Sequence, residues 1–413
     1  MKSYPKYESY KDSGIDWLGE IPNDWELLKV KNIFRLVMKF APKNNDCELL
    51  SVYTDIGLKP RKELEERGNR ATTTDGYLIV EKGDIVVNKL LAWMGAIGLS
   101  DYDGVTSPAY DILKPKIPIE GIFYHLLFRS PQCTSELKRH SRGIMDMRLR
   151  LYFDKFGDVV VPYPNIEVQK KIVSFLAEKT AQIDQAIALK QQQIEKLNEY
   201  KQIVIQNAVT KGLNPNTPMK NSGVEWIGDI PQQWEVKKLK FLCTFDTGNK
   251  DTVNAVDEGQ YPLFVRSQNI ETIDEYTHDC EAVLTAGDGA GVGKVFHYYK
   301  GKFCFHQRVY MFNKFREVDG KYFYYYFSSL FYKIALDGSA KSTVDSLRRP
   351  MIANFPIVYP NKAKQIEIVE FLDNKMTHFE KSENLYKTQI ERLKEYKNIL
   401  INQAVTGKIK IDS

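Results

Sequence analysis

The 413-residue chain lacks several features that would place it in common classes of protein. Its five cysteines lie far apart and form no CxxC pair, which argues against a structural metal site and for reduced cysteines in a protein core (Cys47, Cys133, Cys243, Cys280 and Cys304). The start, MKSYPKYESYKDSG, is polar and has no secretory hydrophobic segment. The most apolar stretch, residues 85–99, is interrupted by Asn88 and Lys89 and is too short to span a bilayer. We therefore expect a cytoplasmic protein that binds no metal.

Catalytic motifs are also missing. There is no HExxH, no PD…(D/E)xK spacing and no NPPY-like methyltransferase signature. The segment GDGAGVGK (287–294) resembles a phosphate-binding loop only superficially, because GxxxxGK[ST] requires glycine where Asp288 stands and a hydroxyl residue where Val295 stands. We expect no catalytic residue and no cofactor in this chain. Its many isolated carboxylates leave a hidden nuclease site as an alternative.

Charge alone does not identify a partner. Lys and Arg total 58 against 53 Asp and Glu, so the net charge of +5 is only mildly basic. Such a charge permits a nucleic-acid partner without requiring one.

The chain repeats itself. Residues 12–34, DSGIDWLGEIPNDWELLKVKNIF, align with residues 221–243, NSGVEWIGDIPQQWEVKKLKFLC. Residues 163–212, which begin YPNIEVQKKIVSFL, align with residues 359–408, which begin YPNKAKQIEIVEFL. The intervening stretches, about 35–160 and 244–356, show little similarity to each other. A kept frame with two divergent inserts indicates that the inserts hold different specificities, although neutral drift is the alternative.

The repeated frame is helical. Apolar residues recur at alternating spacings of three and four over several heptads in both copies, which is typical of a coiled-coil seam. Polar residues that also fall on the seam, Lys397 among them, are expected to set register or orientation. The predicted seam residues are Val173, Leu176, Ile183, Ile187, Ile194, Leu197 and Val204 in the first copy, and Val369, Leu372, Met376, Phe379, Ile390, Leu393 and Leu400 in the second.

A helix of this length spans ~60 Å, too long to be buried against one insert, so we expect the two copies to pack on each other. The first helix should end near Lys211, before GLNPNTP. We predict an α+β protein in which two globular mixed α/β domains are joined by two long antiparallel helices that form a coiled coil, with pseudo-two-fold symmetry. The predicted parts are a connecting segment (1–20), a first domain (21–162), a central helix and linker (163–220), a second domain (221–358) and a C-terminal helix (359–413).

Both inserts are predicted to be rich in strands. Residues 76–90 suggest a strand pair, and residues 105–113, 293–299 and 301–312 suggest further strands. Each insert has one aromatic helical stretch, 121–139 or 320–336, and ends in an apolar strand, 158–164 or 354–360. The aromatic residues are expected to form cores more often than base-stacking surfaces.

Basic segments stand just before the last strand of each insert. Loops that present Arg, Lys, Ser and Asp suit phosphate contacts and readout of base edges, and a solvated basic loop is the alternative. Further planar or basic side chains are weaker candidates, and Asn88, Lys89 and Trp93 could equally form a turn and a core. The predicted DNA-binding residues are Asn88, Lys89, Trp93, Lys138, Arg139, Arg142, Asp146, Arg148 and Arg150 in the first insert, and Arg266, Ser267, Asn269, Lys294, Gln307, Arg308, Lys341, Ser342, Arg348 and Arg349 in the second.

The sequence resembles the specificity subunits of type I restriction–modification systems over essentially its whole length. The resemblance rests on the duplicated SGIDWLGEIPNDW and SGVEWIGDIPQQW segments, the duplicated Q-K-IV-x-FL helices and the repeated LxEYKxxxIxxAVT ends. The insert phrases VVNKLLAWMGAIGLSDYDGVTSPAY and AGDGAGVGKVF also resemble known target-recognition domains.

The resemblance implies that each domain reads one half of a bipartite, asymmetric site in double-stranded DNA, while the helices set the spacer. It implies two modification subunits that methylate adenine with S-adenosylmethionine, and restriction subunits that use ATP and Mg²⁺. An alternative is a coiled-coil adaptor whose inserts bind proteins.

Overall fold

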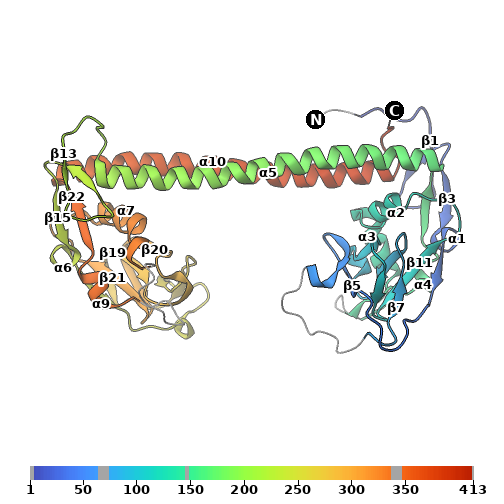
Figure 1. The fold of residues 1–413 in the computed structure, drawn as a ribbon, viewed down its shortest axis with the longest axis horizontal. Helices are drawn as coiled ribbons and strands as arrows, with labels where there is room; N and C mark the ends of the chain where they lie inside the picture. The colour runs from blue at the N-terminus through green and yellow to red at the C-terminus, as the bar shows by residue number, and fades with distance from the viewer. Residues whose placement is uncertain (1–3, 64–73, 145–147, 336–346, 412–413) are drawn as a thin grey trace. The chain divides into compact units, whose positions relative to one another are not determined.

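The computed structural model describes residues 4–63, 74–144, 148–335 and 347–411 (Figure 1). The chain forms two compact units, one of residues 1–190 with 388–413 and one of residues 191–387. Each unit contains half of each of two long helices, α5 (Ile166–Lys211) and α10 (Lys362–Val405). Each unit also carries one folded domain, named here the first head (residues 21–162) and the second head (residues 221–358).

The two long helices pack against each other within each unit. In the first unit, Leu176 and Ile183 of α5 share a core cluster with Leu400 of α10. In the second unit, Leu372 and Phe379 of α10 lie in a cluster with the far end of α5. Since the beginning of one helix meets the end of the other in both units, the helices run antiparallel, as predicted.

The other predicted seam positions follow the same division. The positions that lie in or against the cluster of the first unit are Val173, Ile187 and Leu393, and those of the second unit are Leu197, Val204, Val369 and Met376. Ile390 is buried and Ile194 half-buried, but neither belongs to a core cluster. The polar seam residue Lys397 of α10 forms an ion pair with Asp184 of α5, with Nζ 2.6 Å from Oδ2.

Glycine ends both helices against a tryptophan. Gly212 follows α5 with φ of 78°, and Gly407 follows α10 with φ of 73°, a left-handed conformation that glycine adopts without a steric penalty. A Cβ atom on Gly407 would lie 2.5 Å from Cδ of Pro22 and 3.1 Å from the ring of Trp25. A Cβ atom on Gly212 would lie 3.3 Å from the ring of Trp234. The repeated tryptophans therefore mark the ends of the long helices.

A short hairpin leads into each head: β1 (Tyr10–Asp12) pairs with β2 (Glu20–Pro22), and β13 (Met219–Asn221) pairs with β14 (Asp229–Pro231). In the second unit the chain runs from α5 directly into this hairpin. In the first unit, residues from both ends of the chain meet there. The amide of Lys410 donates to the carbonyl of Pro5 at 2.8 Å, and Nζ of Lys408 donates to the carbonyl of Leu18 at 2.6 Å.

The two heads share one sheet topology despite their dissimilar sequences. The first head has a four-stranded sheet with the order β4-β11-β8-β9, and the second has a six-stranded sheet that begins β16-β21-β19-β20. Among these four strands of each sheet, the first along the chain lies beside the last, and the second and then the third follow on the other side of the last strand. In the second head β17 and β18 extend this arrangement beyond β20. The bounds are β4 Phe34–Val37, β8 Ile85–Asn88, β9 Ile97–Leu99 and β11 Tyr110–Pro115, and β16 Thr244–Thr247, β17 Tyr261–Phe264, β18 Glu271–Ile273, β19 His278–Ala286, β20 Phe296–Phe305 and β21 Val309–Asn313.

Smaller elements complete each head. The first and last strands of each head pair with each other, β3 with β12 and β15 with β22. Two further pairs, β5 with β6 and β7 with β10, belong to the first head. The remaining bounds are β3 Glu26–Lys29, β5 Leu50–Tyr53, β6 Gly57–Pro60, β7 Leu78–Val80, β10 Gly104–Thr106, β12 Val160–Tyr163, β15 Glu235–Lys238, β22 Pro356–Tyr359, α1 Val30–Ile33, α4 Phe153–Phe156, α6 Leu239–Leu242, α8 Tyr332–Ala335 and α9 Arg349–Ala353, with the 3-10 turns η1 Arg61–Glu63, η2 Ala92–Met94, η4 Thr252–Asn254 and η5 Gly289–Gly291.

Three local predictions were wrong. The two strands of residues 76–90 do not pair with each other: β8 is buried along its whole length and lies between β11 and β9, while β7 pairs with β10. Residues 301–312 are not one strand, because the chain turns at residues 306–308 between β20 and β21. Residues 121–139 form two helices, α2 (Gly121–Phe128) and α3 (Pro131–His140), because Pro131 cannot continue α2.

The aromatic helices form cores, as expected. Phe123, Tyr124 and Phe128 of α2 are buried in the first head. In the second head α7 (Gly320–Leu330) packs against β19 and β20 and buries Tyr322 and Phe327 (Figure 1). These side chains are therefore excluded from base stacking.

A buried glutamine ties each head to the start of its long helix. Oε1 of Gln169 accepts the amide of Glu120, just before α2, at 2.9 Å, and its Nε2 donates to the carbonyl of Pro164. Oε1 of Gln365 accepts the amide of Asp319, just before α7, at 2.6 Å. Both glutamines are fully buried, so the repeated glutamine of the motif fixes the head on the helix.

The prediction for the cysteines is confirmed in part. All five are free, and Cys133, Cys243 and Cys304 are buried as expected. Cys280 is half-buried, and Cys47 is exposed, so Cys47 does not belong to a core.

Candidate nucleic-acid interface

The predicted site residues gather at equivalent places in the two heads. In the first head the loop after β8 (residues 89–96) is joined to the basic segment by a hydrogen bond from the amide of Leu151 to the carbonyl of Lys89, 2.9 Å long. In the second head the loop after β19 (residues 287–295) receives the same bond, from the amide of Leu347 to the carbonyl of Gly287, 2.8 Å long. The same two segments therefore meet in both heads, with different side chains.

Asn88 and Lys89 shape the loop of the first head from within. Asn88 is 6% exposed, and its Oδ1 accepts the amide of Leu90 at 3.0 Å. Nζ of Lys89 donates to the carbonyl of Pro108 at 2.6 Å and lies 3.5 Å from Oδ1 of Asp111. The pKa of the Asp111 carboxyl is raised because the side chain is buried, and the neighbouring Lys89 offsets only part of this effect. Both side chains therefore have partners within the first head, and their assignment as DNA contacts stays a prediction.

Trp93 and Lys138 lie together at the surface of the first head. The ammonium of Lys138 stands 5.0 Å from the centre of the Trp93 ring. The indole Nε1 donates to the carbonyl of Leu90 at 3.2 Å, so the ring is held at the loop rather than in a core. Leu91 and Met94 of the same loop are exposed. This loop therefore presents an apolar surface with a cation beside it.

The basic segment of the first head is partly helical, which corrects its prediction as a loop. Lys138 and Arg139 lie in the last turn of α3, where Arg139 pairs with Glu136 at 3.3 Å. Arg142 and Arg150 face each other in a short antiparallel bridge with backbone hydrogen bonds of 2.9 and 2.8 Å. Arg148 is exposed, and Asp146 lies outside the described residues.

Two arginines of the second head converge on one carboxylate. Nη1 of Arg266, which follows β17, lies 2.8 Å from Oδ1 of Asp288. Nη1 of Arg308, which precedes β21, lies 2.9 Å from Oδ2 of the same residue. The sequence interpretation selected both arginines and missed Asp288, which it considered only as a departure from a phosphate-binding loop. An acid between two glycines at a strand end is the signal that could have found it.

The other candidates of the second head surround this cluster. His297 contacts the carbonyl of Ser267 through Nε2 at 3.0 Å, and Gln268 donates to the carbonyl of Lys294 at 3.2 Å. Nε2 of Gln307 donates to Asp251 at 2.8 Å. Ser267, Asn269, Lys294 and Gln307 are all exposed. The turn at 306–308, the segment 266–269 and the glycine-rich loop thus form one surface.

The last basic segment of the second head is divided. Lys341 and Ser342 lie outside the described residues. Arg348 is exposed and precedes α9. Arg349 is held against β16, where it pairs with Asp246 at 3.2 Å and stacks on the Phe245 ring. Arg348 is therefore the stronger candidate for a DNA contact.

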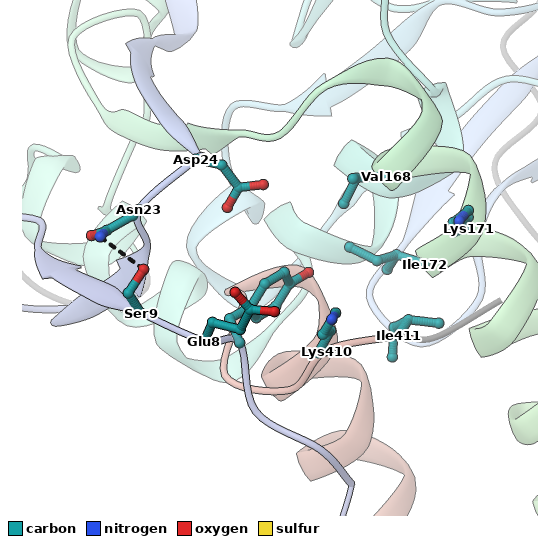
Figure 2. A pocket seen from close by; sticks show the side chains of 10 residues that line it. Glu8, Ser9, Asn23, Asp24, Val168, Lys171, Ile172, Lys410 and Ile411 are labelled. Carbon is teal, nitrogen blue, oxygen red and sulfur yellow. Dashed lines mark hydrogen bonds between the residues drawn. The ribbon is translucent and has the colours of Figure 1, made fainter.

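A second repeated feature is a cleft at each helix start. In the first unit a cleft of about 400 Å³ lies between the lead-in hairpin, α5 and the C-terminal residues (Figure 2). Figure 2 shows Asn23 hydrogen-bonded to Ser9 beside it, with Val168, Lys171 and Ile172 contributed by α5. In the second unit a cleft of about 330 Å³ is lined by the equivalent stretch of α10, residues 364–368, together with the end of α5. The frame therefore offers the same hollow twice.

Within the described residues, no helix combines the length and the apolar composition needed to cross a membrane.

Comparisons with known proteins agree with the repeated plan. A family model described as type I restriction modification DNA specificity domain matches residues 22–199 and again residues 231–394. The chain is 27% identical to the EcoDI specificity subunit of Escherichia coli over 182 residues, which cover 44% of this chain and 40% of that protein. It is 23% identical to the MjaVIII specificity subunit of Methanocaldococcus jannaschii over 100% of this chain and 98% of that protein.

Solved structures share the fold. A chain from a structure on complex assembly and conformational transition of the type I R-M system matches with a TM-score of 0.67 and 14% identity, over 93% of this chain and 98% of that chain. The HsdS subunit from Thermoanaerobacter tengcongensis matches with a TM-score of 0.51 and 15% identity, over 94% and 98% of the two chains.

Proposed function

Because the chain belongs to the family of type I restriction modification DNA specificity domains, we propose that it is the subunit through which such a complex recognises its DNA sequence. Each head reads one half of a bipartite site, and the paired long helices set the spacer between the halves. The chain itself carries out no bond-breaking step. The family match favours this function over an adaptor whose heads bind proteins.

The observation that carries the proposal is the pair of equivalent surfaces with unlike chemistry. One sheet topology delivers the loop after its second strand to the same basic segment in both heads. In the first head this loop is apolar around Trp93, and in the second it is a glycine-rich loop around Asp288. Sequence is read by base-edge contacts in the grooves, so two surfaces of different chemistry suit two different half-sites.

We also propose that the repeated frame binds two modification subunits. Its repeated parts are the long helices and the two clefts beside the lead-in hairpins. Two like hollows suit two copies of one partner. S-adenosylmethionine, and ATP with Mg²⁺ for restriction subunits, would belong to the partners rather than to this chain.

Mapping of N6-methyladenine in genomic DNA, with and without the gene, tests recognition. We expect one bipartite motif to disappear when the gene is removed. If no motif disappears, or if methylation ignores sequence, the proposed function is wrong.

Two exposed arginines then test the division between the heads. We expect Arg148→Ala to weaken binding through one half-site and Arg348→Ala through the other, each by about five- to 150-fold if the arginine reads a base. An arginine that contacts phosphate instead should reduce the salt dependence of binding. Arg392→Ala, at an exposed position on α10, is the matched control and should bind like the original chain. Equal effects of both arginines on both half-sites would contradict the division.

A further inference from the structure

The pair of arginines around Asp288 supports a more specific statement about the second head, which rests on the proposed function. We propose that Asp288 is a positioning residue that holds Arg266 and Arg308 ready to read guanine in the half-site of the second head. The predicted half-site therefore contains guanine on at least one strand, at a position read through the major groove.

The glycines around Asp288 allow the loop to approach both arginines. The amide of Gly287 donates to the carbonyl of Arg308 at 2.8 Å, and a Cβ atom on Gly287 would lie 2.9 Å from that same oxygen. A Cβ atom on Gly291 would lie 2.5 Å from the carbonyl oxygen of Arg266. A side chain at either position would push the loop away from an arginine backbone. The segment that resembles a phosphate-binding loop is thus explained by close backbone packing.

The geometry leaves each guanidinium able to bind a base. Each arginine uses Nη1 for the carboxylate, and in the described part of the chain no hydrogen bond engages its Nε or Nη2. That free edge has two parallel donors, which match the O6 and N7 acceptors of guanine. The side chains of Arg266 and Arg308 are 42% and 59% exposed, whereas that of Asp288 is 18% exposed. The arginines therefore face solvent, with the carboxylate beneath them.

The arrangement also suits the charge of DNA. An exposed carboxylate would repel the phosphate backbone, but Asp288 is flanked by two cations, so the cluster keeps a net positive charge. Holding two long side chains in one geometry reduces the rotamer entropy that is lost on binding. Gln307, held by Asp251 at 2.8 Å, repeats the same device beside the cluster.

The equivalent loop of the first head contains no such cluster in its described residues. It presents Leu91, Trp93 and Met94, which suit apolar contact with bases rather than a bidentate contact with guanine. The inference therefore applies to the second half-site alone.

Duplexes that carry 7-deazaguanine, which lacks the N7 acceptor, provide the test. The mapped bipartite site is synthesised with this substitution at one guanine at a time, and binding is measured for the purified chain and for its complex with modification subunits. We expect the original chain to lose affinity on the order of tenfold at one or two guanines of the second half-site. A second half-site without guanine, or equal affinity for guanine and 7-deazaguanine at every position, would overturn the proposal.

Variants separate positioning from a structural role. Arg266→Lys and Arg308→Lys keep the charge but lose the planar pair of donors, so we expect one or both to bind guanine and 7-deazaguanine duplexes equally. Asp288→Asn should lower this discrimination about tenfold while its affinity for random-sequence DNA stays equal or rises, because a negative charge is removed. Asp279→Asn, an exposed acid on β19, is the control and should keep the original discrimination.

The outcomes distinguish this proposal from the proposed function. If Asp288→Asn melts like the original chain and keeps the full discrimination, Asp288 is not a positioning residue. If Asp288→Asn fails to fold, the two lysine variants still decide whether the arginines read guanine. If the original chain binds all sequences alike, the proposed function fails, whereas specific binding that ignores N7 refutes only the guanine inference.

Discussion

Gln365 joins the second head to its long helix, and its replacement by leucine tests how much its hydrogen bonds stabilise this junction. Leucine keeps the volume of the side chain but removes bonds to the amide of Asp319 (2.6 Å), the carbonyl of Glu317 (2.8 Å) and the carbonyl of Pro360 (2.7 Å). With about 1 kcal/mol net for each bond, and more where a buried group is left unpaired, the loss is about 3 kcal/mol. Gln169→Leu removes two such bonds in the first unit, for about 2 kcal/mol.

Hydrogen–deuterium exchange measured by mass spectrometry reports the protection of backbone amides in each unit separately. A loss of about 3 kcal/mol corresponds to protection reduced roughly 100-fold, and we expect this around residues 317–323 for Gln365→Leu. Gln169→Leu should act around residues 120–124 instead. Gln193→Leu, at an exposed position on α5, should change neither region. Protection reduced less than about threefold, or reduced equally in both units, would refute the role given to these glutamines.

Two further predictions concern stability. Burial lowers the pKa of His125 to about 4, so the unfolded chain, with a pKa of roughly 6.5, binds more protons between these values. The free energy of unfolding should therefore fall by roughly 3 kcal/mol as the pH decreases from 6.5 to 4. Urea titrations should show that His125→Gln removes this dependence on pH. The control His378→Gln, at an exposed position on α10, should keep it. Gly407→Ala should lower the free energy of unfolding by about 2–5 kcal/mol, because it adds backbone strain at positive φ and a steric clash with Pro22. Gly14 also has positive φ but has open space around it, so Gly14→Ala should lose only about 1–2 kcal/mol in the same assay. Equal losses for the two glycine variants would contradict the packing described at the helix end.

Much of the frame could be predicted because its signals are local or periodic. The heptad spacing identified both long helices, and the packing of two equal copies with near two-fold symmetry suggested that they run antiparallel. Glycine and proline after Lys211 marked the end of the first helix. The predicted seam did not include Ile172 and Ile368, although both are buried. Heptad spacing reports only the face that meets the other helix, whereas these two residues pack in the core clusters that include the heads.

The heads were harder to predict because their contacts are distant in sequence. The two short β-branched runs in residues 76–90 indicated strands, but they did not reveal that β7 and β8 join different sheets. The shared topology of the heads left no trace in their sequences, since a sheet order can be built from many residue patterns.

The sequence could indicate which polar side chains stand near strand ends, but it could not indicate which of them are buried. Arg266 and Arg308 were selected as planar donors and do lie together. Asn88 has the same chemistry but is turned inward to hold a loop, which its sequence neighbours do not reveal. Asp288 was missed because its role depends on two residues that are each at least 20 positions away.

The central claim is that the heads determine the letters of the site and the helices determine the gap between them. Inserting one heptad in both helices, after Gln192 and at the repeat-equivalent Thr388, keeps the antiparallel seam in register and lengthens each helix by ~10 Å. Mapping of N6-methyladenine should then show both half-sites unchanged and a spacer longer by about three base pairs, at ~3.4 Å each. Altered half-site letters, or an unchanged spacer, would contradict the account.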